Sequence, residues 1–357
     1  MIKIYYDKTQ QGVSLTHLLY PNFKIQHRAG KSLFSDGIFK QFTEPVVAIT
    51  GRPEDADFIL LPHNYGQIKD NQELFSHYVD LAKLQHKRLI IFAYGDIDYD
   101  IDIPEAIIFK NALYRFKKKR NEIKLPLFVE DLGARWGIDY QAKAHTKPSV
   151  GFCGWAEYAS LRQRARAMLY HQFINVQKSL THTPELETLK QGIYFRKKIL
   201  HRLEQSTLIE SKFIRRSAFF LHKNTITVAA DAGRQEFVAN IKQSNFSLAV
   251  RGDMNDSARL YEIMSLGRIP VLLDTETVLP FEGTLDYSKC LVRIPYPEIM
   301  DSPEIISKFY REQTSNSLIA MQKEARRVFE KQLRVDAYFI SIFASPEQLL
   351  AELKEVV

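Results

Sequence analysis

Hydrophobic residues recur along the first 145 residues as short, nearly continuous runs separated by polar segments. The clearest runs are IKIYY (2–6), VVAIT (46–50), DFILL (57–61), RLIIFAY (88–94) and AIIFK (106–110). Between the third and fourth runs, the segment 71–87 places its apolar residues at helical spacing. Apolar strands joined through a helix are typical of a parallel sheet covered on both faces. We therefore predict a doubly wound α/β domain over residues 1–145.

The same alternation restarts after the polar segment DYQAKAHTKP (139–148), which we interpret as a linker. The pattern predicts strands at SVGFCG (149–154), 246–252, 269–273 and 290–294, and helices over 157–173, 192–205 and 257–267. Two helical patterns follow, from about Pro303 to Gln332 and from about Asp336 to Val357. A chain of 357 residues fits two domains. We expect the second domain over residues 146–335, and a C-terminal helix over 336–357 that packs back on the first.

Composition narrows the class of protein. Hydrophobic residues make up 45% and charged residues 25%, which is ordinary for a globular chain. No apolar run approaches the roughly 18 residues that span a bilayer, and the first residues do not resemble a secretory signal, so we expect a cytoplasmic protein. Cys153 and Cys290 lie in apolar, strand-like contexts that suit reduced core residues better than a disulfide or a metal site.

The net charge of +7 and the basic runs 116–124 and 213–217 fit three classes of partner: nucleic acid, anionic lipid or an anionic small substrate. Because the aromatic residues are not interleaved with the basic runs, the pattern disfavours nucleic acid, which we keep as the lesser alternative.

The most informative chemistry lies in residues 244–281. A buried strand ends at Arg251-Gly252, and Asn255, Asp256 and Ser257 can cap the helix that follows. A helix N-terminus at the carboxyl end of a parallel strand is a ready site for an anion. Arg259 lies in the first turn of this helix. We set aside the triplet Arg251-Gly252-Asp253, since three residues are a weak signal for adhesion.

Glu262 lies one turn after Arg259 on the same predicted helix. One interpretation is an exposed Arg–Glu pair on the helix surface. The other is a nucleotide site, in which the arginines hold a diphosphate and the carboxylate of Glu262 accepts hydrogen bonds from the ribose hydroxyls.

The block from Ser244 to Phe281 resembles the C-terminal core of the exostosin family of glycosyltransferases, with its strand ending in Arg-Gly, its Ser-x-Arg-x-x-Glu helix, its Ile-Pro-Val strand and its Leu-Pro-Phe. Upstream, RPEDADFILLPHNYG (52–66) is similar to the family's strand that leads into Pro-x-x-Tyr. The resemblance implies a GT-B fold, with two Rossmann-like domains facing across a cleft, and an inverting transferase that uses a UDP-sugar. It implies a donor site made of Arg251, Arg259, Glu262, Ser257, Asn255 and Gly252.

No metal or other cofactor is expected, because arginines and a helix dipole can stabilise a diphosphate. The lack of a membrane anchor and of lumenal cysteines favours a bacterial-type enzyme of surface polysaccharide synthesis, such as lipopolysaccharide or capsule. The expected acceptor is a glycan or a lipid-linked saccharide, and the basic surface could hold the chain against an anionic membrane. A non-catalytic nucleotide- or sugar-binding homologue is the main alternative.

An inverting transfer needs a base on the acceptor side, and two residues that follow first-domain strands are candidates, His63 and Asp96. Each could instead be an ordinary turn residue. Tyr65 and Tyr94 stand beside them in sequence and are expected on the acceptor side. Asp96 also begins the alternating run GDIDYDIDIP (95–104). Same-side residues of an extended segment lie roughly 7 Å apart, so the four aspartates cannot converge on one metal ion, and we expect only Asp96 to face the cleft.

Overall fold

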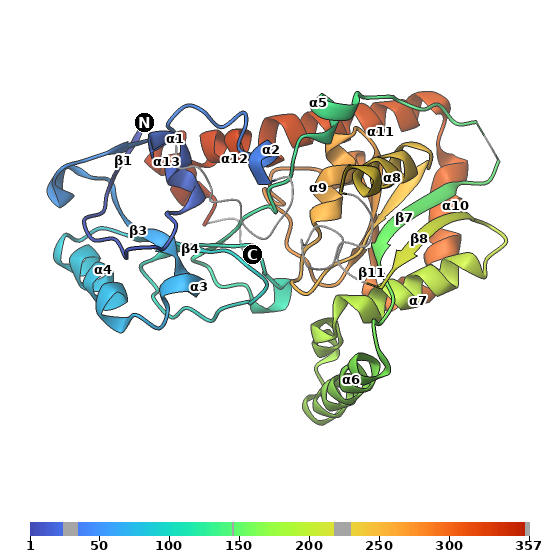
Figure 1. Cartoon of the computed structure of the whole chain (residues 1–357), viewed down its shortest axis with the longest axis horizontal. Coiled ribbons are helices and arrows are strands. Elements are labelled where there is room, and N and C mark those ends of the chain that lie inside the picture. Colours follow the sequence, from blue (N-terminus) through green and yellow to red (C-terminus); the bar gives the residue numbers. More distant parts are fainter. Residues whose placement is uncertain (24–34, 145, 218–229, 354–357) are drawn as a thin grey trace.

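The computed structural model describes residues 1–23, 35–144, 146–217 and 230–353, and it shows two α/β domains side by side (Figure 1). Each domain is built on one sheet in which every pair of neighbouring strands is parallel. Helices cover both faces of both sheets. The predicted class, two doubly wound domains with C-terminal helices, is confirmed.

The first sheet has six strands in the order β2-β1-β3-β4-β5-β6. Their bounds are β1 Ile2–Tyr5, β2 Val47–Ile49, β3 Phe58–Asn64, β4 Leu89–Ala93, β5 Ile107–Lys110 and β6 Glu122–Lys124. The short helices here are α1 Tyr20–Phe23, α2 Ser35–Ile38, α3 Tyr65–Ile68 and α5 Leu132–Trp136. The long helix α4 (Gln72–Leu84) covers one face of the sheet and buries Tyr78 and Ala82 there.

The C-terminal segment covers the opposite face of the first sheet. There α12 (Val335–Ile342) and α13 (Pro346–Ala351) bury apolar side chains against β1, β3, β4 and β5. The ring of Phe339 lies between those of Phe42, Phe92 and Phe128, with centroid distances of 5.4, 6.0 and 5.4 Å. After the second domain, the chain therefore returns to the core of the first through α12 and α13.

The second sheet has five strands in the order β11-β10-β9-β7-β8. Their bounds are β7 Ser149–Trp155, β8 Glu210–Arg216, β9 Phe246–Ala249, β10 Ile269–Asp274 and β11 Val292–Pro295. Helices α7 (Gly192–Glu204) and α10 (Ser302–Glu312) pack on one face, and α8 (Ala230–Lys242), α9 (Ala258–Ser265) and α11 (Ser315–Val328) on the other. The helix α6 (Leu161–Thr181) projects from this domain (Figure 1).

The structure differs from the sequence patterns in several places, of which the following have a clear physical reason. Strand β6 lies inside the basic run 116–124, and β8 overlaps the run 213–217. Neither strand was predicted, because their charged residues do not form apolar runs. The helix expected over 303–332 is broken between α10 and α11, where Thr314 and Ser317 form a capping box, and it then continues as the π-helix Phe329–Leu333. The last helical pattern is divided into α12 and α13.

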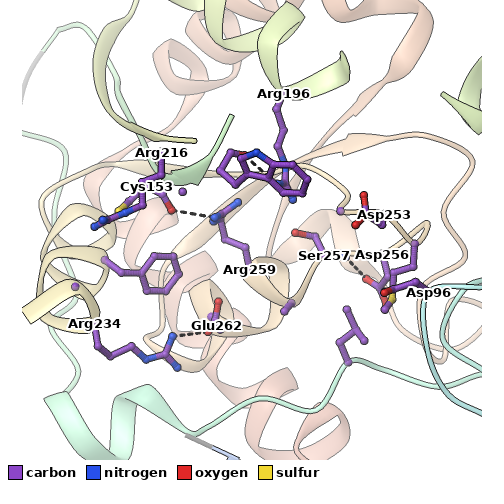
Figure 2. A pocket seen from close by; sticks show the side chains of 18 residues that line it. Asp96, Cys153, Arg196, Arg216, Arg234, Asp253, Asp256, Ser257, Arg259 and Glu262 are labelled. Carbon is purple, nitrogen blue, oxygen red and sulfur yellow. Dashed lines mark hydrogen bonds and ion pairs between the residues drawn. The ribbon is translucent and has the colours of Figure 1, made fainter. Parts of the chain in front are cut away.

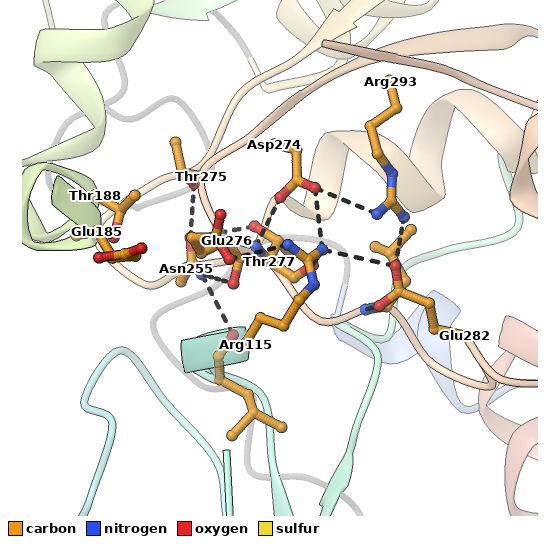
Figure 3. A network of polar contacts seen from close by, with 12 residues as sticks. Arg115, Glu185, Thr188, Asn255, Asp274, Thr275, Glu276, Thr277, Glu282 and Arg293 are labelled. Carbon is orange, nitrogen blue, oxygen red and sulfur yellow. Dashed lines mark hydrogen bonds and ion pairs between the residues drawn. The ribbon is translucent and has the colours of Figure 1, made fainter. Parts of the chain in front are cut away.

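Polar contacts join the two domains at the ends of their sheets. Arg115 of the first domain donates to Asp274 at 3.1 Å and to Glu276 at 3.0 Å, and Arg293 pairs with the same Asp274 (Figure 3). Closer to the cavity described below, Lys124 of β6 forms a buried ion pair with Asp256 at 2.8 Å. Buried pairs of this kind fix orientation, because breaking one leaves an uncompensated charge in the interior.

No helix among the described residues is long and apolar enough to cross a membrane.

Candidate functional site

A cavity of about 330 Å³ opens between the domains, at the carboxyl ends of β7 and β9 and at the N-terminus of α9 (Figure 2). This is where open parallel sheets bind ligands. Most of its lining comes from the second domain, while Asp96 and Leu127 come from the first. Its charged lining residues are Arg196, Arg216, Arg234, Arg259, Asp96, Asp253, Asp256 and Glu262.

The N-terminus of α9 forms one wall of the cavity. Ser257 occupies the N-cap position, but its hydroxyl makes no capping hydrogen bond, which differs from the capping role that the sequence suggested. Asp256 instead accepts from the Ser257 N–H at 2.6 Å and from the hydroxyl of Tyr261 at 3.0 Å. The Ser257 side chain is thus left to face the cavity, beside backbone N–H groups that have no partner within the helix.

Two arginines lie beside this helix end and pair with no carboxylate of the residues that the structure describes. Arg259 donates to the carbonyl of Cys153 at 2.9 Å and stacks over Phe152, and Arg196 donates to the carbonyl of Trp155 at 2.9 Å. Neither forms an ion pair with any carboxylate of the described ranges, and each has an Nε without a hydrogen-bond partner.

Burial disfavours the charged form of both guanidinium groups. Burial lowers the pKa of Arg259. Burial, followed by the neighbouring charge of Arg259, lowers the pKa of Arg196 to about 9, which still leaves it a cation at neutral pH. A buried positive pair at a helix N-terminus would be stabilised by a bound anion, and most of all by one with two negative groups.

Glu262 also lines the cavity, but its partner is not the predicted one. It accepts from Arg234 at 2.7 Å, and Arg234 in turn reaches Glu130 at 3.5 Å. Figure 2 shows this Arg234–Glu262 pair, and both of its side chains are almost fully buried. The exposed Arg259–Glu262 pair, one of the two interpretations of the sequence, is therefore not formed.

Asp96 and Asp253 bring one carboxylate from each domain to the cavity. Asp96 lies in the loop after β4, and Asp253 in the loop between β9 and α9. Partial burial and then the charge of Asp253 raise the pKa of Asp96. A carboxylate with a raised pKa is a better proton acceptor than an ordinary surface aspartate.

The other aspartates of the run 95–104 point elsewhere. Asp98 pairs with the buried Lys110, which also contacts Glu122, and it does not line the cavity. Asp100 and Asp102 pair with Lys119 at 2.5 and 3.8 Å. The described part of the chain contains no group of three or more potential metal ligands. Of the four aspartates, only Asp96 reaches the cavity.

Arg251 and Asn255, predicted in the donor site, lie in the domain interface instead. The Arg251 guanidinium donates to the Tyr114 hydroxyl and to the carbonyls of Thr188 and Asp253, each at 2.6 Å. The Asn255 amide donates to the Leu113 and Glu276 carbonyls, and its oxygen accepts from two threonine hydroxyls. Neither side chain lines the cavity, whereas Gly252, beside Arg251, does. The strand end was located, but sequence could not indicate the direction of its arginine.

The acceptor-side predictions divide in the same way. His63 is fully buried, with Nδ1 bonded to the Ser14 carbonyl and Nε2 accepting from the Gln10 N–H, so both ring nitrogens are occupied. The Tyr94 hydroxyl bonds Thr16 and the His17 N–H, and Tyr65 packs its ring against Phe75 and Tyr99. These three side chains stabilise the first domain and do not line the cavity, which leaves Asp96 as the base candidate.

Several cavity residues were missed from sequence. Arg196 belongs to a predicted helix from which no site residue was chosen, and Arg216 to a basic run for which three classes of partner stayed open. Arg234 and Trp155 carried no local signal. Asp253 stood in the triplet that was set aside. The clue available was the charge excess itself, because several of those cations face one cavity.

Comparisons with known proteins find a likeness to exostosins over part of the chain. Residues 188–309 match the exostosin GT47 domain. A stretch of 104 residues is 30% identical to exostosin-2 of Bos taurus, and one of 101 residues is 26% identical to the exostosin-1 homolog of Caenorhabditis elegans. These cover 29% and 28% of this chain, which spans only 13% and 25% of those two proteins.

Two solved structures show a distant likeness. TarM matches with a TM-score of 0.31 and 11% identity, over 72% of this chain and 55% of that chain. Anabaena HepE, solved in complex with UDP and glucose, matches with a TM-score of 0.34 and 9% identity, over 87% of this chain and 89% of that chain.

Proposed function

We propose, from the premise that residues 188–309 belong to the exostosin GT47 domain family, that the protein is an inverting glycosyltransferase with a nucleotide-sugar donor, a UDP-sugar. One observation carries the proposal. Arg196 and Arg259, two buried cations without a carboxylate partner among the described residues, face a cavity at the N-terminus of α9. That combination suits a nucleoside diphosphate better than a neutral ligand.

The donor site follows from this placement. The diphosphate would lie against the first turn of α9, with Arg259, Arg196 and the Ser257 hydroxyl as donors. Each charge-assisted hydrogen bond contributes about 1.5–3 kcal/mol. The same groups would stabilise the charge that grows on the departing diphosphate, so the reaction we propose needs no metal ion. Glu262, which accepts from Arg234, would also accept from the ribose hydroxyls.

The acceptor enters from the first-domain side, where Asp96 lines the cavity. In a single displacement, Asp96 takes the proton from the acceptor hydroxyl while the oxygen of that hydroxyl attacks the anomeric carbon. The bond from that carbon to the diphosphate oxygen breaks with inversion. The raised pKa of Asp96 supports this role. As acceptor we propose a glycan or lipid-linked saccharide of surface polysaccharide synthesis.

A panel of nucleotide-sugars tests the proposal, read first by thermal shift and then by nucleotide release. Arg259→Ala should raise the Kd for UDP about 10- to 100-fold, as expected for one lost charge-assisted bond, and abolish transfer. Arg327→Ala removes an exposed arginine paired with Glu324 and is the matched control. Wild-type turnover in Arg259→Ala would show that the donor site is misplaced. Binding without turnover across the panel would favour the non-catalytic homologue. Salt-dependent binding of RNA or DNA would favour a nucleic-acid-binding protein.

A further inference from the structure

The helix α6 (Leu161–Thr181) is attached to the second domain along one side only. It buries Ala167, His171 and Ile174, and it packs on the 3-10 helix Pro184–Leu189 and on Tyr194 of α7. The rest of the helix projects into solvent (Figure 1). A helix of 21 residues that buries three of them leaves most of its surface without a partner in the described chain.

Large apolar side chains gather on the free side of this helix. Leu169, Phe173, Val176 and Leu180 are 73, 57, 55 and 76% exposed. Spacings of four, three and four residues place them in one stripe, which we call the α6 outer face. Single exposed leucines are ordinary, but a continuous apolar stripe on a projecting helix marks an interaction surface.

The same helix carries only positive charge. It contains Arg162, Arg164, Arg166 and Lys178 and no aspartate or glutamate. Helical spacing continues the outer face from Leu169 back through Arg166 and Arg162. Lys178 pairs with Glu187, whereas the three arginines form no ion pair with a carboxylate of the described ranges. The outer face is thus basic at its N-terminal end and apolar over the rest.

A basic groove lies beside α6, between it and α7. Its volume is about 750 Å³, and no aspartate or glutamate is among its lining residues. Arg164 and Lys198 line it without an ion pair to any carboxylate that the structure describes. Lys190, Lys197, Arg202 and Arg215 also line it, each already paired with a glutamate.

We propose that the α6 outer face docks on an anionic phospholipid surface, with the helix lying in the interface plane. Leu169, Phe173, Val176 and Leu180 would enter the boundary of the acyl chains, while the arginines and the basic groove meet the lipid phosphates. The charge argues against a second copy of the chain as the occupant, because two faces that carry only cations repel each other.

Docking would also orient the cavity. The N-cap of α6 is Ser160, a few residues after Trp155, which lines the cavity at the end of β7. A chain held through α6 would keep this side of the cavity near the lipid surface, where a lipid-linked acceptor is found. This consequence rests on the proposed function, whereas the docking itself does not.

Vesicle co-sedimentation tests the docking, with phosphatidylcholine vesicles that contain either no anionic lipid or about one-third phosphatidylglycerol. The wild-type chain should bind the anionic vesicles, more weakly at high salt, and bind neutral ones far less. Leu169→Glu/Phe173→Glu should lower binding about 100-fold or more, since two apolar side chains no longer enter the lipid. Arg162→Gln/Arg166→Gln should lower it roughly 30-fold, from about 1 kcal/mol per cationic side chain.

The control is Leu84→Glu, which changes a leucine that is 74% exposed on α4 of the first domain and should bind like the wild type. Thermal shift with UDP in the absence of vesicles shows that each variant is folded, and it tests the donor site separately from docking. Three results would overturn the proposal: equal binding by wild type and α6 variants, equal binding to neutral vesicles, or a wild-type dimer in sedimentation that Leu169→Glu/Phe173→Glu dissociates.

Discussion

Asp96 of the first domain and Asp253 of the second line the same cavity, and the charge of Asp253 raises the pKa of Asp96. Because a base acts only when deprotonated, kcat/KM should fall as the pH drops through the pKa of Asp96. That pKa lies above its ordinary value of 3.8, with the charge of Asp253 as one of two causes. Asp253→Asn removes this cause, so we expect the acid limb of the kcat/KM profile to move to lower pH. Asp96→Asn should lower kcat by about 100- to 10,000-fold.

The control for this pair is Asp102→Asn, which changes an exposed aspartate of the same run whose carboxylate lies 3.8 Å from Lys119. Its profile should match that of the wild type. An acid limb that stays in place in Asp253→Asn would remove Asp253 from the account, and near-normal turnover in Asp96→Asn would remove Asp96 as the base.

Gly154 makes room for the arginine that we place against the diphosphate. A Cβ atom at this position would overlap Nη2 of Arg259, so Gly154→Ala should displace the guanidinium and raise the Kd for UDP about tenfold. Isothermal titration measures this directly. Gly51→Ala is the control, since a Cβ there meets nothing within 4 Å. If Gly154→Ala and Arg259→Ala disturb the same contact, the double variant Gly154→Ala/Arg259→Ala should bind UDP no more weakly than Arg259→Ala alone.

At the scale of elements, the sequence predicted those strands and helices that have a clear local pattern of apolar residues. The central strands β3, β4, β9 and β10 are buried on both faces and therefore appear as apolar runs, and the N-terminus of α9 followed from its place after β9. The strands β6 and β8 lie at sheet edges and carry charged residues, so the same rule missed them.

The site was predictable only to the level of its location. The pattern located the N-terminus of α9 and the loop that carries Asp96, which both line the cavity. It could not give the arginine directions: Arg259 turns into the cavity, while Arg251 turns into the domain interface. Those directions depend on Tyr114 and Cys153, which are distant in sequence from the arginines they contact.

Strand β6 places Lys124 in the interior, and its buried ion pair allows a prediction about stability. The side chains of Lys124 and Asp256 are 2 and 1% exposed and form an ion pair at 2.8 Å. Lys124→Met leaves the Asp256 carboxylate buried without its cation and should lower the free energy of unfolding by about 3–5 kcal/mol. Adding Asp256→Asn should recover part of this loss. Urea denaturation measures both, and Arg327→Met, which breaks an exposed pair, should cost no more than about 1 kcal/mol.

Across the whole molecule, ion pairs and a chain crossing hold the two domains in one arrangement. Arg326 of α11 forms a bidentate pair with Asp131 before α5, and Arg115 reaches across to Asp274 (Figure 3). The C-terminal helices then return to the first domain and complete one face of its sheet. The first domain should therefore depend for its stability on α12 and α13, and the cavity walls should depend on both domains.

Phe339 allows that dependence to be measured. Its ring is fully buried between Phe42, Phe92 and Phe128, so Phe339→Ala should cost about 3–5 kcal/mol of stability. Hydrogen exchange locates the loss: amides of β3 and β4 should exchange faster by a larger factor than those of β9 and β10, because α12 completes the core of the first domain. The neighbouring Ile340 is 55% exposed, and Ile340→Ala should change exchange little. A larger acceleration in β9 and β10 would mean that α12 stabilises the second domain instead.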